Sequence, residues 1–405
     1  MTQSVAEQDV YLPPPEAPGA VKWLRDNLFK GWLNILLTLT SAAFLYFALN
    51  LVLTWLLTEA DWTPVINFPI LFAVGQYPRE ELWRIGALLS MLAFLLGLSW
   101  RQWGGLLRGV SLYVGAFFLV LGAMPVAHAA LTPGMRAFLI SLPLTILIAY
   151  RLGVTKVVSK RLVIILWLLY PLLGVILIRG IAGSPFLELV STTVWGGLLV
   201  TFVLSVGGIV LSFPIGVALA LGRRSKLPVL SAVSTFFIET IRGVPLVTLL
   251  FMFSIILALF LPPDARLDRL LRALIAMTIF SAAYVAENVR GGLQAVPDGQ
   301  IEAARALGMN GVQIMGLIVL PQALRITIPA MVGQFISLFK DTTLVVIVGI
   351  NDFLGIGRSI VNSNPQYLRS QLEVYLFIAA VYWVFSYVMS LASRRLEESL
   401  GVGKR

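Results

Sequence analysis

Long runs of apolar residues, separated by short polar loops, recur along the whole chain. A helix needs about 20 mostly apolar residues to cross the hydrocarbon of a bilayer, and these runs have that length. Strands of an outer-membrane barrel would instead alternate polar and apolar residues over about 10 positions. The pattern therefore predicts an all-α integral membrane protein. Its ten predicted spans run from Gly31 to Leu57, Arg84 to Trp100, Gly109 to Pro125, Met135 to Tyr150, Leu162 to Ile178, Thr192 to Leu221, Leu230 to Leu261, Leu270 to Val289, Ile326 to Ile350 and Val374 to Ala392.

The composition agrees with this prediction. Of 405 residues, 58% are hydrophobic and 12% are charged, whereas soluble domains carry about 25% charged residues. The first 30 residues are polar, acidic at first and rich in proline, and they lack the short apolar core of a signal peptide. We therefore expect residues 1–30 to form an uncleaved cytoplasmic tail.

The basic residues predict the orientation of the spans. If the first span enters from the cytoplasm, basic residues in the inner loops outnumber those in the outer loops about two to one, as the positive-inside rule requires. Both termini are then cytoplasmic, including a C-terminal tail over residues 396–405. The net charge of +10 comes from loops beside the spans, so it favours contact with lipid headgroups over binding of nucleic acid.

The chain offers few groups for catalysis or metal binding. It has no cysteine and a single histidine, His128, so disulfides and thiolate metal sites are excluded. A lone histidine near a loop is more often a surface residue than a ligand. We expect no catalytic residue, no metal and no cofactor in this chain.

One polar loop, "IEAARALGMNGVQIMGLIVLPQAL" from Ile301 to Leu324, lies on the predicted cytoplasmic side. Ile301, Ala304, Leu307, Val312 and Met315 recur at helical spacing, which predicts two amphipathic helices on the membrane face. A glycine at position 308 separates them as a break. The loop therefore presents a surface to a partner, or it is an interfacial helix that only anchors the loop.

Individual residues of this loop have expected roles. We expect Glu302 in the first turn of its helix, where the helix dipole favours a carboxylate. Small side chains at Ala303 and Ala304 would keep the surface low so that a partner can come close. Gly308 would turn the chain, if it adopts a positive φ, and Pro321 would end the second helix before the next span.

Charged residues within spans are costly and are therefore candidates for a substrate pathway. Glu287 and Arg290 lie three residues apart near the end of the eighth span, and Glu239 and Arg242 repeat that spacing in the seventh. Lys340, Asp341 and Thr342 lie in the ninth. A zwitterionic substrate would need both charges, with Glu287 the best single candidate because it lies a full turn inside its span. Each acid–base pair could equally be a structural ion pair.

A break in the seventh span is predicted at Gly243 and Pro245, beside Arg242. Backbone groups freed by such a break are tolerated in a membrane only against protein or a cavity. The break could therefore line a pathway, or it could be a packing kink.

The loop resembles a known motif. Glu302, Ala303, Ala304, Gly308 and then Ile318, Leu320 and Pro321 match the EAA loop of prokaryotic ABC importer permeases at every spaced position. The resemblance implies that the loop is a coupling helix, which docks on a separate cytoplasmic ATPase. The chain has no G-x-x-x-x-G-K-[ST] phosphate loop, its only Gly-Lys pair being Gly403–Lys404. ATP and Mg would therefore bind to the partner ATPase.

Three further stretches resemble the polar amino acid permeases: "IETIRGVPLV" (Ile238–Val247), "AYVAENVRGGLQAVPDGQIEAARALGM" (Ala283–Met309) and "SLFKDTTLVVIVG" (Ser337–Gly349). The resemblance covers about the last half of the chain. It implies a five-helix type I permease core over residues 186–395, with a coupling loop near 291–324 and additional spans over 31–185. The chain is most similar to the general L-amino acid importer permease, with the glutamate, glutamine, aspartate and asparagine importer as the nearest rival. Ile241, Val244 and Thr343 depart from the usual family residues and concern substrate preference.

The resemblance also implies partners and a location. These are a second homologous permease, a cytoplasmic ATPase dimer and a periplasmic amino acid binding protein, in a bacterial inner membrane. Two other classes of protein predict different features. An ion-coupled secondary amino acid transporter often shows inverted repeats of interrupted spans, and none is recognisable in this sequence. A membrane enzyme would need a clustered set of nucleophiles, bases or metal ligands, for which the chain has few residues.

Overall fold

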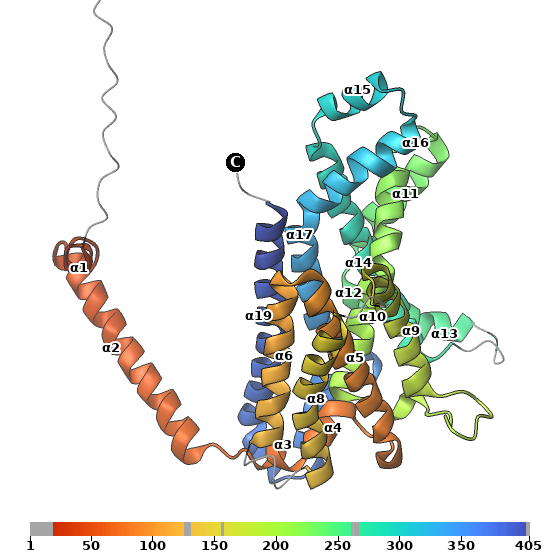
Figure 1. The fold of residues 1–405 in the computed structure, drawn as a ribbon. Coiled ribbons are helices and arrows are strands. Elements are labelled where there is room, and N and C mark those ends of the chain that lie inside the picture. Colours follow the sequence, from red (N-terminus) through yellow and green to blue (C-terminus); the bar gives the residue numbers. More distant parts are fainter. Residues whose placement is uncertain (1–18, 125–130, 155–157, 261, 263–266, 402–405) are drawn as a thin grey trace, which may run out of the picture. The chain divides into compact units, whose positions relative to one another are not determined.

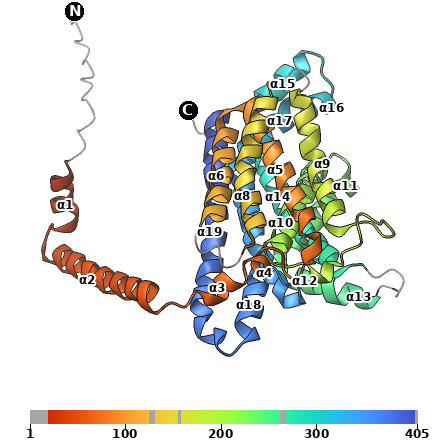
Figure 2. The same ribbon diagram turned by 60° about the horizontal axis from the view of Figure 1, so that its bottom comes forward.

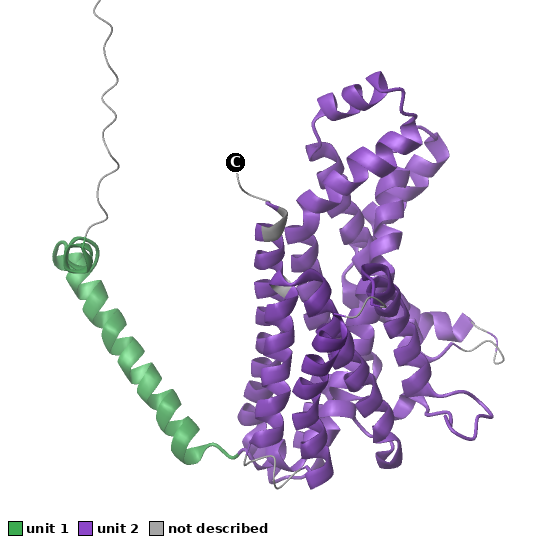
Figure 3. Cartoon of the chain, viewed as in Figure 1, with its two compact units in different colours: residues 1–61 green, residues 62–405 purple. Residues whose placement is uncertain are grey.

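The computed structural model describes residues 19–124, 131–154, 158–260, 262 and 267–401. His128, Gly403 and Lys404, together with most of the predicted N-terminal tail, lie outside the described residues. Within them the chain is helical, and β-pairing is limited to two isolated bridges, Gly75 with Trp195 and Gly197 with Asp352. The chain divides into two compact units, residues 1–61 and residues 62–405 (Figure 3).

The first unit consists of a short helix and a long one. They are α1 (Ala20–Leu28) and α2 (Trp32–Thr54), and the π-helical turn η1 (Trp55–Glu59) extends α2. The helix formed by α2 and η1, Trp32–Glu59, carries no charged residue except Glu59 at its end. In its most apolar window no residue is buried. A long apolar helix of this kind has the length and surface of a membrane span.

The second unit begins with the helices that precede the predicted permease core. They are α3 (Thr63–Asn67), α4 (Pro69–Val74), the short 3₁₀ turn η2 (Arg79–Glu81), α5 (Leu82–Trp103), α6 (Gly105–Ala123), α8 (Pro133–Leu152) and α9 (Lys160–Arg179). We call this set the extension. Its helices α5, α6, α8 and α9 lie side by side as a bundle (Figures 1 and 2).

The remaining helices form the core. They are the 3₁₀ turn η3 (Thr192–Val194), α10 (Gly197–Arg223), α11 (Pro228–Gly243), α12 (Leu246–Phe251), the π-helical turn η4 (Met252–Ile256), α13 (Leu257–Phe260), α14 (Arg269–Ala295), α15 (Asp298–Ala306), α16 (Gly311–Gln313), the π-helical segment η6 (Ile314–Val319), α17 (Leu320–Asp341), the 3₁₀ segment η7 (Thr342–Val348), α18 (Phe353–Ser363), the 3₁₀ turn η8 (Tyr367–Ser370) and α19 (Gln371–Leu400). Figure 1 shows α15 and α16 at one end of this unit, and α18 lies towards the other end (Figure 2). We call these the α15 end and the α18 end.

The number of spans differs from the predicted ten. Among the described residues, eight helices are long and apolar enough to cross a membrane, and a ninth is obtained if the bent pair Pro228–Gly243 and Leu246–Phe260 counts as one span. The predicted span from Gly109 to Pro125 corresponds to the shorter apolar helix Leu107–Ala123. At a rise of 1.5 Å per residue this helix falls short of a hydrocarbon core of about 30 Å.

Helix α14 is the most buried span, with 61% of its apolar window inside the protein. It packs between α10 and α17 through small residues such as Ala282 and Ala286, which are fully buried. A Cβ on Gly216 of α10 would lie 2.6 Å from the Val285 side chain. Helices in lipid are not driven together by the hydrophobic effect, so they associate through close van der Waals packing. The small residues of α10 and α14 allow this close packing.

The extension and the core are not separate in space, although the sequence predicted a boundary between residues 185 and 186. At the α18 end, the Gly196 N–H donates to the Val74 carbonyl at 3.2 Å and the Gly197 N–H to the Asn351 carbonyl at 3.0 Å. Gly75 has φ +68°, and a Cβ there would lie 2.5 Å from the Gly196 backbone. This close approach of two backbones joins α4 directly to the start of α10.

Candidate coupling loop and charged network

The predicted loop lies at the α15 end as two helical segments joined at a glycine. Gly308 has φ +77°, its N–H donates to the Arg305 carbonyl at 2.9 Å, and the Met309 N–H donates to the Ala304 carbonyl at 3.2 Å. This is the Schellman arrangement, which satisfies the last carbonyls of a helix and needs a left-handed residue. Asn310 then begins the next segment with a capping box shared with Gln313. The turn at Gly308 is therefore well defined by hydrogen bonds.

The exposed surface of the loop differs from the predicted one. Ala303 is exposed, but Ala304 is buried. Only Ala303 therefore presents a small side chain to an approaching partner. Leu307 and Val312, expected on the apolar inner face, are 82% and 84% exposed. The reason is the left-handed turn, which interrupts the helical periodicity between them. Two large apolar side chains thus face outward on either side of Gly308.

Two further expectations for this loop were wrong. Helix α15 begins at Asp298, so Glu302 lies in the second turn and Asp298 is the acidic residue of the first. Pro321 does not end a helix, because it lies in the first turn of α17, which continues from η6. A proline there removes an N–H and crowds the preceding turn, and the wider π-helical turn directly before it accommodates this change.

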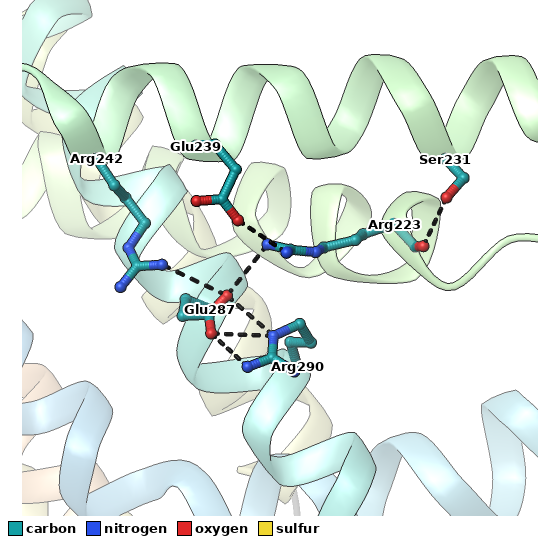
Figure 4. A network of polar contacts seen from close by, with 6 residues as sticks. All are labelled: Arg223, Ser231, Glu239, Arg242, Glu287 and Arg290. Carbon is teal, nitrogen blue, oxygen red and sulfur yellow. Dashed lines mark hydrogen bonds and ion pairs between the residues drawn. The ribbon is translucent and has the colours of Figure 1, made fainter.

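Glu287 lies at the centre of a network of charged side chains near the α15 end (Figure 4). Arg290 Nε donates to both Glu287 carboxylate oxygens at 3.0 Å. Arg223 from α10 lies 3.4 Å from Glu287 and 2.8 Å from Glu239, and Arg242 lies 3.6 Å from Glu287. Three guanidinium groups therefore meet two carboxylates, which leaves one net positive charge where α10, α11 and α14 come together.

The network corrects the predicted pairing within α11. Glu239 and Arg242 share no ion pair; Glu239 contacts Arg223, and Arg242 contacts Glu287 instead. The spacing of three residues correctly indicated only the contact between Glu287 and Arg290. The sequence does not indicate Arg223 as a candidate. It is the last residue of α10, where a basic residue is expected next to a cytoplasmic loop, and it has no helical spacing to Glu239 or Glu287.

Arg242 differs from the other two arginines of the network in its surroundings. Its guanidinium lies 5.5 Å from the centre of the Tyr284 ring, and its buried Nε has no hydrogen-bond partner. The predicted break follows at once, since α11 ends at Gly243 and the next helix begins at Leu246 with a bend of 105°. Discontinuous membrane helices form the substrate and ion sites of many transporters, and Arg242 lies beside such a break.

The three candidates in the ninth span lie in different surroundings. Lys340 is exposed, and Asp341 is half-buried at the end of α17. Thr342 is fully buried, and its hydroxyl donates to the Phe339 carbonyl at 2.8 Å and lies 3.2 Å from the Tyr382 hydroxyl. The structure therefore does not bring these three together with Glu287.

Thr342 belongs to a second polar cluster, which lies at the α18 end. The Tyr382 hydroxyl also donates to Asp352 at 3.1 Å, and Asp352 caps α18 by accepting from the Gly355 N–H at 2.9 Å. Asp352 is fully buried in the linker between the last two candidate spans, and burial raises the pKa of its carboxyl to about 6. Within the described part of the chain, no group of three His, Asp or Glu residues could hold a metal ion.

Residues 212–402 match the family of binding-protein-dependent transport system inner membrane components. The chain is 34% identical over 402 residues to the inner membrane amino-acid ABC transporter permease protein YhdY of Escherichia coli (strain K12), covering 95% of this chain and 94% of that protein.

Two further relatives differ in how much of the chain they match. The glutamate/glutamine/aspartate/asparagine transport system permease protein BztC of Rhodobacter capsulatus is 36% identical over 427 residues, covering 96% of each chain. The probable glutamine ABC transporter permease protein GlnP of Bacillus subtilis is 38% identical over 205 residues, which is 50% of this chain but 91% of that protein. Some relatives therefore span the full length of this chain, and others correspond to about half of it.

Proposed function

Because the chain belongs to the amino-acid ABC transporter permeases, we propose that it is one of two homologous membrane subunits that carry L-amino acids from a periplasmic binding protein to the cytoplasm. Its relatives are named for glutamate, glutamine, aspartate and asparagine or for glutamine, so small polar amino acids are the proposed cargo. Membership of this family favours the ABC importer over an ion-coupled secondary transporter. Both termini are proposed to be cytoplasmic, as the basic loops predict.

The α15 end is the proposed docking surface for a separate cytoplasmic ATPase dimer, which would bind ATP and Mg in place of this chain. The observation that carries this proposal is the pair of exposed apolar side chains, Leu307 and Val312, held on either side of a hydrogen-bonded turn at Gly308. Exposed apolar surface rimmed by polar residues marks sites of contact with protein or membrane. Glu302 and Ala303 lie on the same exposed surface of α15.

Substitution of Gly308 by valine tests this docking surface. A Cβ at Gly308 would meet no atom within 4 Å, so the effect comes from the left-handed φ of +77°, which a β-branched residue disfavours. The turn should then change, and the complex should lose both uptake and the stimulation of ATP hydrolysis by binding protein in reconstituted vesicles. Gly299→Val, in α15 without a positive φ and with open space for its Cβ, is the matched control.

A second variant separates docking from folding. Leu307→Ser removes an exposed apolar side chain and leaves the turn unchanged, so membrane insertion should be normal. We expect the amount of ATPase that co-purifies with the complex to fall about tenfold, as for a central interface residue. Normal co-purification and normal stimulated hydrolysis in both variants would mean that the loop only anchors the chain to the membrane surface.

The charged network is proposed to line the part of the substrate pathway nearest the α15 end. An amino acid presents a carboxylate and an ammonium, and the network offers partners for both, with Arg242 incompletely paired and Glu239 more than half exposed. Lys340 is exposed within a candidate span, and a charge at that depth normally faces protein or water. We therefore propose that Lys340 faces the second permease or the pathway, with Asp341 and Thr342 beside it.

A further inference from the structure

Helix α1 presents an apolar face that the structure leaves uncovered. Val21, Leu24 and Leu28 recur at a spacing of three and four residues and so lie on one face. Lys22 and Arg25 lie outside that face. None of the nine residues of α1 is buried, and Val21 is 81% exposed. The helix is therefore amphipathic without a protein partner within its own unit.

The connection to α2 brings α1 to a membrane surface. Only three residues separate the two helices, Gly31 among them adopts φ +88°, and the Thr38 hydroxyl donates to the Leu28 carbonyl at 2.8 Å. This hydrogen bond ties the last turn of α1 to the second turn of α2, and the two helices meet at a corner (Figure 2). Since α2 is an apolar span with no buried residue in its most apolar window, the last turn of α1 lies where that span leaves the hydrocarbon.

The charges around this corner indicate which surface α1 fits. Lys22, Arg25 and Lys30 are basic, and Asp26 is the one acidic residue between Ala20 and Trp32. The Trp23 and Trp32 side chains are 50% and 78% exposed, and tryptophan favours the level of the lipid headgroups. A short basic helix with an apolar face and tryptophan lies in the plane of an anionic membrane surface.

We propose that α1 binds the surface of the membrane that α2 crosses, with its apolar face among the acyl chains and its basic residues on anionic lipid headgroups. The chain thereby recognises phosphate-bearing lipids at its N-terminal end, independently of the solute that it carries. Each basic residue near an anionic surface strengthens binding about fivefold. Loss of two of them should weaken the preference for anionic lipid about 25-fold.

Spin labels on the full-length chain test this proposal. The chain has no cysteine, so Leu24→Cys and Asp26→Cys each provide a single labelling site. The chain is reconstituted in vesicles of phosphatidylcholine, with and without phosphatidylglycerol. The label at position 24 should be shielded from a water-soluble nickel chelate and open to oxygen, and the label at position 26 should show the reverse. Phosphatidylglycerol should strengthen this difference.

The variant Lys22→Gln with Arg25→Gln should lose the effect of phosphatidylglycerol. The matched control removes two exposed basic residues elsewhere, Lys226→Gln with Arg305→Gln, and should keep the effect. Equal accessibility at positions 24 and 26 in both membranes would overturn the proposal, because α1 would then lie in water. Protection at position 24 that is independent of lipid charge, and unchanged in the Lys22 and Arg25 variant, would also overturn it, because the basic residues would then have no part in holding α1.

Discussion

The two ends of the second unit are stabilised in different ways. At the α18 end, backbones approach closely at Gly75 and Gly196, and Arg84 is fully buried with its Nε 2.7 Å from Glu81 and its Nη1 donating to the Glu188 carbonyl at 2.8 Å. At the α15 end, an apolar cluster that includes Val289, Leu293 and Ala323 packs beside a network of long charged side chains. The extension there reaches the core through exposed Arg395, whose guanidinium lies 5.8 Å from the Tyr113 ring.

This difference indicates which end can change conformation. Backbone contacts and the ion pair of a fully buried arginine are lost only at high cost, because unpaired buried groups remain. The partly exposed arginines and glutamates of the network can instead exchange partners or water at a lower cost in free energy. The end that carries the proposed ATPase surface is thus the end whose contacts can be rearranged, and the extension is fixed chiefly at the other end.

Among the variants that test this difference between the two ends, Gly75→Ala should lose the most stability. The added Cβ would lie 2.5 Å from the Gly196 backbone at φ +68°, and we expect a loss of about 3–4 kcal/mol of stability from the combined strain and overpacking. Gly183→Ala is the control, since Gly183 has φ +79° with open space for a Cβ, and should lose about 1–2 kcal/mol. Thermal unfolding in detergent measures both. Equal losses would show that the α18 end is not closely packed.

The pH dependence of stability probes the same end through Asp352. Its pKa is raised to about 6 in the folded protein, from about 3.9 in an unfolded chain, so folding favours the protonated form. This stabilisation is complete below about pH 4 and is lost as the pH rises through 6, an effect of about 2–3 kcal/mol. In Asp352→Asn the unfolding midpoint should fall less between pH 4 and pH 7. The same pH dependence in both proteins would contradict this assignment.

At the α15 end, Glu287→Gln should have an intermediate effect. The side chain is 22% exposed, so the cost of leaving Arg242 and Arg290 without a carboxylate is reduced by solvent to about 1–2 kcal/mol. If Glu287 lines the pathway, uptake per assembled complex should also show an apparent affinity about tenfold weaker. Glu239→Gln, at a position that is 56% exposed, is the control for stability. Unchanged uptake per assembled complex would make the network purely structural.

Arg395→Gln should have the smallest effect. A cation over an aromatic ring at an exposed site contributes about 0.5–1 kcal/mol, and the unfolding midpoint should fall by the corresponding small amount. Arg394→Gln, which alters the exposed neighbouring arginine, serves as the control. A loss as large as that of Gly75→Ala would mean that the extension is fixed equally at both ends, and the proposed contrast would be wrong.

Local sequence chemistry was sufficient for much of the fold and part of the site. Apolar runs predicted the helical membrane character, because backbone groups in lipid must be satisfied within a helix. Gly243 and Pro245 predicted the break in the seventh span, and Gly308 predicted the turn between α15 and α16, because each residue acts on its own backbone. The spacing of Glu287 and Arg290 likewise predicted their ion pair, since residues three apart share a helix face.

The tertiary structure decided which charges meet, which alanine is buried and where the extension joins the core. Arg223 and Glu287 are 64 residues apart in sequence, yet they meet because α10 packs against α14. In the same way, Glu239 pairs with Arg223 and Arg242 with Glu287 in place of the pair expected within α11, since an ion pair forms with the nearest opposite charge in space and not in sequence. Hydrophobic and charge patterns act over one or two helical turns. The contacts between α4, α10 and the start of α18 depend on distances that only the packed helices determine.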